Sequence, residues 1–236
     1  MSEIKEVFDK MHIELPDNAL DLLNHYYEML IETNKVMNLT AITEYSEVII
    51  KHFADSAAIG CITDMNRNLN VIDVGTGAGF PGIVLKIVYP QLSVVLLDSL
   101  NKRVNFLKNV ITELGLTDIS AIHGRAEDIA RNKDYREKFD LCVSRAVANM
   151  SSLSEYCLPF VKVGGKFIPY KADGCDEEVR AASKAVNILG GKIQKIDSYV
   201  IPDTDICRKF VIVDKLRNTS AKYPRKAGLP TKEPLI

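Results

Sequence analysis

The sequence predicts an α/β fold in which a mostly parallel, seven-stranded sheet ends in an antiparallel hairpin and follows an N-terminal helical extension. From residue 70 onwards, short apolar segments alternate with helical segments, which is typical of a parallel sheet covered by helices on both faces. The last two apolar segments are separated only by residues 201–206, too few for a crossover helix, so they should pair antiparallel. The first 60 residues show helical periodicity instead.

The N-terminal region is expected to form helices that pack on the same core as the sheet. Leu20, Leu23, Tyr27 and Leu30 repeat at the spacing of one helix face. A further helix is expected over residues 45–59, and no glycine-rich linker separates this region from the rest. We therefore expect a helical extension over residues 1–60, a sheet domain over residues 61–214 and a basic tail over residues 215–236.

Seven strands and four intervening helices are expected after residue 60. The strands are the apolar, β-branched segments at residues 70–74, 93–98, 119–123, 139–144, 166–170, 192–200 and 207–214. The helices fall between them, at residues 81–88, 101–114, 151–158 and 177–189. Ligands of open α/β sheets bind beyond the carboxyl ends of the strands, so the residues that follow each strand are the candidates for a site.

Composition excludes several classes of protein. The 236 residues carry a net charge of −1, so bulk charge does not indicate nucleic acid. No apolar stretch is long enough to span a membrane, and the N-terminus lacks the apolar core of a signal peptide. The five cysteines form no Cys-x-x-Cys pair and the four histidines no ligand pair, so we expect a reducing cytoplasm and no metal. A monomer is expected, because no heptad pattern is present.

A glycine-rich turn follows the first predicted strand and is the most informative feature of the sequence. Gly75, Gly77, Gly79 and Gly82 lie within eight positions. Because glycine lacks a Cβ atom, the backbone of such a turn can approach a ligand closely. Pro81 suits the first turn of a following helix, whose free N–H groups would face that ligand.

Two classes of cofactor compete for this turn. Residues 77–82 match the Gly-x-Gly-x-x-Gly fingerprint of dinucleotide sites, although short glycine patterns recur by chance. The predicted strand ends just before Gly75, so the fingerprint can also be aligned to start there. Its sixth position is then Phe80, where a dinucleotide site has the glycine that allows close helix packing. The pattern Asp-x-Gly-x-Gly-x-Gly at residues 73–79 resembles instead the first motif of S-adenosylmethionine-dependent methyltransferases.

Acidic residues at the ends of the next two strands fit a nucleoside-containing cofactor. Asp98 ends the second strand, 19 residues after Gly79, and its carboxylate can accept hydrogen bonds from both ribose hydroxyls. The alternative is that Asp98 caps the following helix. After the third strand, Glu127 or Asp128 and the backbone beside Ala126 could bind an adenine ring, or could only be acids in a first helical turn.

Arg145, at the end of the fourth strand, is placed to contact the carboxylate of a cofactor or the substrate. Its planar guanidinium suits a carboxylate or phosphate, and a structural ion pair is the alternative. Asn149 and Lys171 follow the fourth and fifth strands and are weaker candidates for the substrate pocket. His52 is the most interesting histidine, although a lone histidine is more often a surface or core residue. The catalytic candidates are therefore Arg145, Asn149 and His52.

The C-terminal tail is basic although the whole chain is nearly neutral. Residues 215–236 contain six lysines and arginines and one acidic residue, Glu233. A local basic patch of this kind is typical of a surface that binds a phosphate backbone, so we expect Lys222, Arg225 and Lys226 to bind RNA. A solvated, flexible tail is the alternative.

Several motifs together indicate a family. They are DVGTGAGFPG at residues 73–82, LDSLNKR at 97–103, VSRA at 143–146, NLT at 38–40 and YPRKAG at 223–228. From about residue 20 onwards the chain resembles the bacterial 16S ribosomal RNA guanine-N7 methyltransferases, also called glucose-inhibited division protein B. The resemblance implies a Rossmann-like class I methyltransferase fold and a cytoplasmic enzyme that methylates N7 of one guanine near the ribosomal decoding site. It also implies S-adenosyl-L-methionine as cofactor, 16S rRNA or the small ribosomal subunit as partner, and a link between loss of the enzyme and low-level streptomycin resistance.

The family pattern places Gly75, Phe80, Ala126, Glu127 and Arg145 at cofactor-binding positions. The full predicted cofactor set is Asp73, Gly75, Gly77, Gly79, Phe80, Asp98, Ala126, Glu127 and Arg145. Guanine N7 has a free lone pair, so its methylation requires no general base, and no general base stands out in the sequence. A methyltransferase acting on a protein or small molecule, a dinucleotide-dependent oxidoreductase and an RNA-binding scaffold without catalysis remain as alternatives.

Overall fold

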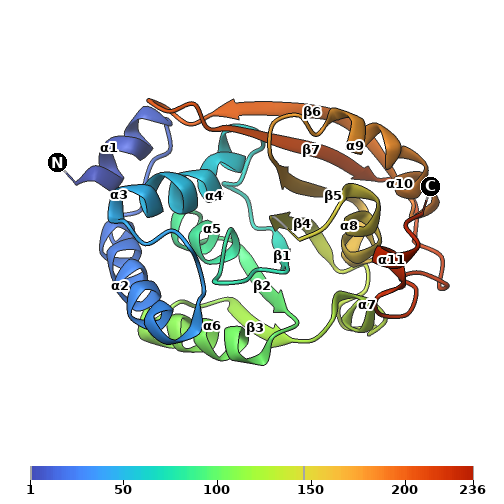
Figure 1. Ribbon diagram of the computed structural model, residues 1–236, viewed down its shortest axis with the longest axis horizontal. Helices are drawn as coiled ribbons and strands as arrows, with labels where there is room; N and C mark the ends of the chain where they lie inside the picture. The colour runs from blue at the N-terminus through green and yellow to red at the C-terminus, as the bar shows by residue number, and fades with distance from the viewer. Residues whose placement is uncertain (1, 146, 236) are drawn as a thin grey trace.

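The computed structural model describes residues 2–145 and 147–235, and its centre is a seven-stranded sheet. The strands are β1 (Asn70–Val74), β2 (Ser93–Asp98), β3 (Ile119–His123), β4 (Phe139–Arg145), β5 (Val161–Lys171), β6 (Gly191–Val200) and β7 (Cys207–Lys215). They lie in the order β3-β2-β1-β4-β5-β7-β6. Strands β1 to β5 are parallel to one another, and β7 is antiparallel to both β5 and β6. The predicted sheet with its terminal hairpin is confirmed (Figure 1).

Helices surround this sheet and precede it. They are α1 (Glu3–Lys10), α2 (Ala19–Met37), α3 (Tyr45–Val48), α4 (Asp55–Ala57), α5 (Gly82–Val88), α6 (Asn101–Glu113), α7 (Ala126–Ile129), α8 (Met150–Cys157), α9 (Asp176–Ala181), α10 (Ser183–Ile188) and α11 (Leu229–Lys232). A π-helix at Ile49–Ala54 joins α3 to α4, and 3₁₀ turns occupy Ala58–Cys61 and Leu158–Phe160.

The sheet separates two hydrophobic clusters, because successive side chains of a strand point to opposite faces. Val71 and Val143 belong to the cluster that α1, α2, α5 and α6 cover. Their neighbours Ile72 and Cys142 belong to the cluster that α8, α9 and α10 cover. Both faces of the parallel strands are therefore buried, as their nearly continuous apolar sequences require.

The N-terminal helices pack on the first face and reach the glycine-rich turn. Tyr26 of α2 is buried, and its hydroxyl donates a hydrogen bond of 2.6 Å to the carbonyl oxygen of Ala78. Figure 1 shows α1 and α2 on one side of the molecule and the C-terminal segment on the other, where α11 lies near α7 and α8. Helix α2 thus supports the glycine-rich turn from the first face of the sheet.

Two predicted helices differ in detail from the structure. Residues 177–189 form the two helices α9 and α10, with a turn at Ala182 between them, rather than one helix. Residues 45–59 form a continuous helical segment whose middle, Ile49–Ala54, is a π-helix. The π-helix has a wider turn, which brings His52 and Asp55 toward β4, and such insertions are frequent at functional sites.

Candidate functional site

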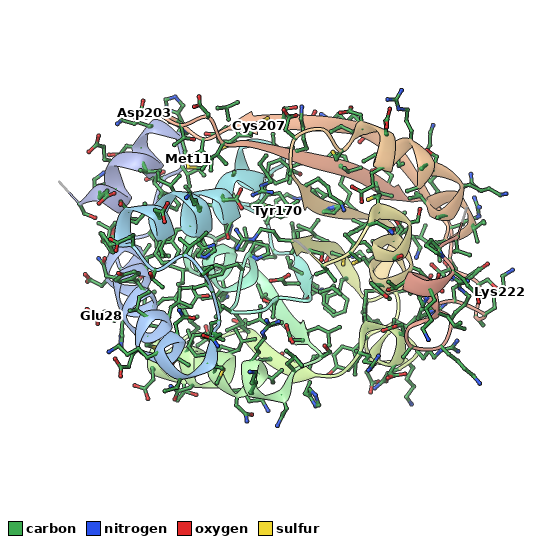
Figure 2. All side chains as sticks on the ribbon, viewed as in Figure 1. Met11, Glu28, Tyr170, Asp203, Cys207 and Lys222 are labelled. Atoms are coloured by element: carbon green, nitrogen blue, oxygen red, sulfur yellow. The ribbon has the colours of Figure 1, made fainter. Side chains whose placement is uncertain are left out.

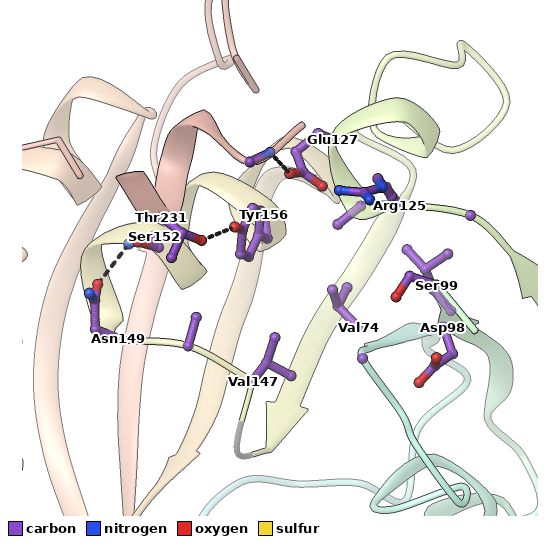
Figure 3. Close-up of a pocket in the computed structure, with 16 residues that line it drawn as sticks. Val74, Asp98, Ser99, Arg125, Glu127, Val147, Asn149, Ser152, Tyr156 and Thr231 are labelled. Atoms are coloured by element: carbon purple, nitrogen blue, oxygen red, sulfur yellow. Dashed lines mark hydrogen bonds between the residues drawn. The ribbon is translucent and has the colours of Figure 1, made fainter. Parts of the chain in front are cut away.

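A pocket of about 440 Å³ opens at the carboxyl ends of the parallel strands (Figure 3). Its walls come from the ends of β1, β2 and β3, from the loop after β4, from α8 and from the C-terminal segment. A pocket of this size is typical of a small-molecule site, and its position is the one expected of an open α/β sheet.

Gly75 forms part of the pocket wall where the backbone leaves β1. Its φ angle is +73°, and a Cβ atom added there would lie 2.5 Å from Cγ2 of Val147, another wall residue. Gly79 faces α2 instead. A Cβ atom added to Gly79 would lie 2.6 Å from the hydroxyl of Tyr26 in that helix. The predicted glycines thus have two different roles, with Gly75 at the pocket and Gly79 in packing.

Asp73 is fully buried under the turn and does not line the pocket. Its Oδ2 atom accepts hydrogen bonds from the Thr76 hydroxyl at 2.6 Å and from the backbone N–H of Gly82 at 2.9 Å. Its Oδ1 atom is buried and has no hydrogen-bond partner among the described residues. Burial raises the pKa of this carboxyl to about 6. Asp73 therefore holds the two ends of the turn together.

Asp98 lines the pocket and also organises the backbone around it. Its carboxylate accepts hydrogen bonds from the N–H of Gly77 at 2.9 Å and the N–H of Leu100 at 2.8 Å. Because each carboxylate oxygen has two acceptor positions, both oxygens retain capacity for a ligand. The predicted ligand contact is compatible with this geometry, whereas the alternative role as a helix cap is not observed, because Leu100 is the N-cap of α6 and no described side chain caps that helix.

Ala126 and Glu127 lie in the first turn of α7 and both line the pocket, together with Arg125. The Glu127 side chain is buried, and its Oε1 atom accepts a hydrogen bond of 3.0 Å from the N–H of Gly228. Glu127 therefore faces the pocket and holds the C-terminal segment beside it.

The loop after β4 forms the floor of the pocket. Asn149 lines it and caps α8 by accepting a hydrogen bond from the N–H of Ser152 at 3.1 Å. Lys171 donates to the Ala148 carbonyl oxygen at 2.9 Å and to Glu178 at 2.8 Å, so it holds this loop in place. Ala146, the last residue of the VSRA motif, lies outside the described residues.

Arg145 lies outside the pocket wall, in a second polar cluster next to it. Its Nη1 atom is 2.7 Å from Oδ2 of Asp55, and Arg208 of β7 is 2.6 Å from Oδ1 of the same carboxylate. Asp55 is 0% exposed. The structural ion pair that was the alternative for Arg145 is therefore present, and it ties β4, β7 and the helical extension together.

His52 lies beside Arg145 and is neutral at pH 7. Burial, and secondly the charge of Arg145, lower its pKa to about 4. Its Nε2 atom is 2.9 Å from the hydroxyl of Thr40, which belongs to the NLT motif, and its ring stacks on Phe80 at 4.4 Å between centroids. The NLT motif and the glycine-rich turn thus meet at this histidine.

Phe80 and Tyr170 lie inside the protein rather than in the pocket. Phe80 is 5% exposed and contacts His52, Tyr26 and the guanidinium of Arg145, whose carbon lies 5.2 Å from the ring centroid. Tyr170 is 2% exposed and lies near the centre of the molecule (Figure 2). Of the predicted cofactor set, the pocket wall contains Gly75, Asp98, Ala126 and Glu127.

The three tail residues predicted to bind RNA have different surroundings. Arg225 forms an ion pair of 2.7 Å with the buried Glu155. Lys222 and Lys226 are exposed, no ion pair of theirs occurs among residues 2–145 and 147–235, and Lys222 lies at the edge of the molecule (Figure 2). The tail is folded against α8 rather than extended into solvent, since Tyr223 and Thr219 are buried.

Sequence reasoning missed several residues of the site. Tyr156, Gly228 and Thr231 line the pocket, and Asp55 and Arg208 hold Arg145. Asp55 could have been noticed as a carboxylate inside an apolar helical stretch. Gly228 ends the YPRKAG motif, but nothing in the sequence places it or Thr231 at the pocket, because they reach it only through the tertiary fold.

Neither a metal site nor a membrane helix occurs in the described part of the chain. Within residues 2–145 and 147–235, no group of three or more His, Cys, Asp or Glu side chains could hold a metal ion. None of the described helices is both long and apolar enough to cross a bilayer.

Comparison with known proteins gives consistent results at the levels of sequence and fold. A family model, GidB, described as rRNA small subunit methyltransferase G, matches residues 19–207. A protein of Lachnoclostridium phytofermentans named ribosomal RNA small subunit methyltransferase G is 52% identical, with 95% of this chain and 93% of the relative covered. The Clostridium novyi protein of the same name is 49% identical over 97% of this chain and 94% of its own length.

Solved structures of lower identity share the fold. A SAM-dependent O-methyltransferase from Thermotoga maritima superposes with a TM-score of 0.51 at 18% identity, covering 81% of this chain and 73% of the other. A ribosomal protein L11 methylase from Lactobacillus delbrueckii gives a TM-score of 0.52 at 18% identity, covering 69% and 77%. The predicted class I methyltransferase fold is confirmed.

Proposed function

The chain belongs to the GidB family of rRNA small subunit methyltransferases G, and from this premise we propose that it methylates N7 of a guanine in 16S rRNA. S-adenosylmethionine would occupy the pocket of about 440 Å³. The observation that carries the proposal is the joining of Gly75, Asp98 and Glu127 in one pocket at the carboxyl end of the sheet. A bound S-adenosylmethionine supplies an electrophilic methyl group.

The pocket residues fit this cofactor. Gly75 leaves room that a side chain would fill, and the Asp98 carboxylate offers acceptors to a ribose diol. The backbone at Ala126 and the carboxylate of Glu127 offer a donor and an acceptor of the kind that an adenine edge needs. Asp73 acts indirectly, by holding the turn that carries Gly75.

The chemistry agrees with the side chains beside the pocket. Because N7 attacks through a free lone pair, the protein must position two reactants rather than remove a proton, which contributes roughly 7–11 kcal/mol to catalysis. The methylated ring gains a positive charge. His52 is neutral, and Asp55 matches only one of the two guanidinium charges that it bonds, so the cluster with Arg145 and Arg208 keeps one positive charge, which suits a carboxylate or phosphate. We assign Arg145 and Asn149 to orienting the substrate, Arg145 through its partly exposed edge.

The substrate RNA would approach the edge of the sheet where the pocket opens. Lys222 and Lys226 are exposed on the adjacent C-terminal segment and suit contacts with phosphates. Arg225, whose charge is already matched by Glu155, fits an anchor of that segment better than a free phosphate ligand.

Methylation of 16S rRNA tests the proposal directly. Purified protein and radiolabelled S-adenosylmethionine are incubated with naked 16S rRNA, with small subunits, and with ribosomal proteins as control. Label is expected only in 16S rRNA, and reduction followed by aniline cleavage should cut the chain at one labelled guanine. Label in protein, or in RNA that aniline does not cleave, would refute N7 methylation of rRNA.

A thermal shift experiment tests the cofactor separately from the substrate. A ligand that binds only the native state raises the melting temperature. S-adenosylhomocysteine, the demethylated product, is expected to raise it and NAD is not. The reverse result would favour the dinucleotide-dependent oxidoreductase, and no shift with any of them would favour an RNA-binding scaffold.

A further inference from the structure

The C-terminal strap, which we define as residues 219–235, forms one wall of the pocket. Gly228 and Thr231 of the strap line the cavity, and the Thr231 hydroxyl lies 2.6 Å from the hydroxyl of Tyr156 in α8. In Figure 3 this pair lies across the pocket from Asp98. The N–H of Gly228 donates to Glu127, a residue of the opposite rim, at 3.0 Å. The strap therefore contacts two other elements of the pocket wall, α8 through Tyr156 and α7 through Glu127.

Polar side chains of α8 and of the segment before β4 hold the strap in this position. Glu155 is 0% exposed, and Arg225 donates to both of its oxygens, from Nε to Oε1 at 3.0 Å and from Nη2 to Oε2 at 2.7 Å. Arg136 donates to the strap carbonyl oxygens of Thr219 at 2.7 Å and Tyr223 at 3.0 Å. Ser152 donates to the carbonyl oxygen of Pro230 at 2.7 Å.

Apolar packing of the strap is slight by comparison. Tyr223 is its one member of the buried cluster on this face, Leu235 packs partly against it, and Pro224 and Pro230 are its other buried apolar residues. A segment held by hydrogen bonds and few buried apolar side chains has a low free energy of local opening compared with a core strand. Opening of the strap would remove Gly228 and Thr231 from the pocket and leave Glu127 without its partner.

We propose that the C-terminal strap is part of the cofactor-binding site, and that strap docking and cofactor binding stabilise each other. The inference rests on the proposed function, because it takes S-adenosylmethionine as the ligand of the pocket. Coupling between two equilibria is reciprocal, so undocking the strap lowers cofactor affinity by the same factor by which the cofactor favours docking, and weakening the strap lowers affinity to the extent that it populates the undocked state. The wall residues assigned by this inference are Tyr156, Gly228 and Thr231.

Arg136→Met tests the coupling from outside the pocket. Arg136 does not line the cavity, and its loss removes hydrogen bonds to the strap and one to the carbonyl oxygen of Ala130 at the end of α7, but no side chain of the wall. The dissociation constant of S-adenosylhomocysteine, measured by titration calorimetry, is expected to rise at least fivefold. Arg180→Met is the matched control, because Arg180 is exposed and its guanidinium bonds only to its own helix at Asp176. The control should change affinity less than twofold.

Limited proteolysis gives a readout independent of affinity. Trypsin is expected to cleave the wild-type strap at Lys222 and Lys226, and saturating S-adenosylhomocysteine should slow this cleavage at least fivefold. Arg136→Met should speed cleavage without ligand. Equal affinity of Arg136→Met and wild type, or cleavage that the ligand does not slow, would overturn the inference.

A second pair of variants applies if Arg136→Met does not fold. Ser152 and Ser154 are both buried on α8, but only Ser152 bonds to the strap, whereas Ser154 donates to Met150 in its own helix. Because Ser152 also lines the pocket, the readout is tryptic cleavage of the strap without ligand, which Ser152→Ala should speed at least threefold and Ser154→Ala should not, and equal effects would again refute the coupling. Absence of S-adenosylhomocysteine binding to the wild type would instead refute the proposed cofactor.

Discussion

His52 shows how the fold controls the protonation of a single side chain. It faces Arg145 and the Lys51 carbonyl oxygen on one side and Thr40 on the other, with Asp55 one turn further along. Burial and the Arg145 charge lower its pKa to about 4, and Asp55 opposes this only in part. An unfolded chain restores the ordinary value of about 6.5. Protonation therefore favours the unfolded state.

The contribution of His52 to the free energy of unfolding should fall as the pH falls through the window from about 6.5 to 4, whereas Asp73, whose pKa is raised to about 6, opposes this fall below about pH 6. In this window the unfolded state binds a proton at His52 that the folded state does not, and the full effect is about 3 kcal/mol. Urea unfolding at pH 7.5, 6 and 5 measures it. His52→Gln should lose much of this acid sensitivity, whereas His25→Gln, at an exposed position, should keep it. An unchanged pH dependence in His52→Gln would contradict the assignment.

Gly75 gives a second prediction for a single residue. Its φ angle of +73° and the position of Val147, 2.5 Å from an added Cβ atom, make Gly75→Ala both strained and obstructive. S-adenosylhomocysteine affinity should fall at least tenfold. Gly115→Ala is the control, because φ is +60° there and the space is open, so it should lose about 1–2 kcal/mol of stability and no affinity. Equal affinities of the two variants for S-adenosylhomocysteine would contradict the assignment of Gly75 to the cofactor site.

Individual elements differ in how far the sequence predicts them. The parallel strands are predictable, because an apolar segment buried on both faces and bounded by turn residues has few other solutions. The π-helix at Ile49–Ala54 is not, since the extra residue is stabilised by tertiary contacts of His52 and Asp55. The strap is not predictable either, because its charges indicate an RNA-binding tail, or alternatively a solvated one, until Glu155 is placed opposite Arg225.

The same limits apply to the site. Asp98 and Glu127 are predictable because Asp98 ends β2 and Glu127 comes soon after β3, and the carboxyl ends of parallel strands meet at one edge of the sheet. Phe80 is expected at the cofactor from the family pattern, but in the structure its ring lies under His52 and Arg145. Sequence spacing places a residue on an element, whereas the direction of its side chain depends on partners that lie far away along the chain.

The junction of three elements at Asp55 makes the helical extension important for stability. The carboxylate joins the helical segment that carries it to β4 through Arg145 and to β7 through Arg208. Asp55→Asn should cost about 3–5 kcal/mol, because it leaves two partly buried guanidinium groups without their counter-charge. Urea unfolding at pH 7.5 measures the loss. Asp203→Asn, which breaks the exposed pair with Lys10, should change stability by less than about 1 kcal/mol. Similar losses in both variants would contradict a buried network.

At the scale of the whole molecule, recognition of RNA cannot depend on bulk charge. The net charge is −1, and Arg225 is matched by Glu155. Attraction for phosphates must therefore come from local groups near the pocket, such as Lys222 and Lys226 on the strap. The strap would then serve both ligands, with its inner side at the cofactor pocket and its lysines toward RNA.

This division predicts a specific dependence of RNA binding on salt. Each phosphate contact to single-stranded RNA contributes about −0.7 to the slope of log K against log salt concentration. The double variant Lys222→Gln/Lys226→Gln should therefore reduce the slope by about 1–1.5 in fluorescence titrations with a 16S rRNA fragment, and leave S-adenosylhomocysteine affinity unchanged. Arg67→Gln/Lys108→Gln removes two exposed charges away from the strap and should keep the wild-type slope. A slope that changes in neither variant, or equally in both, would place the phosphate contacts elsewhere on the surface.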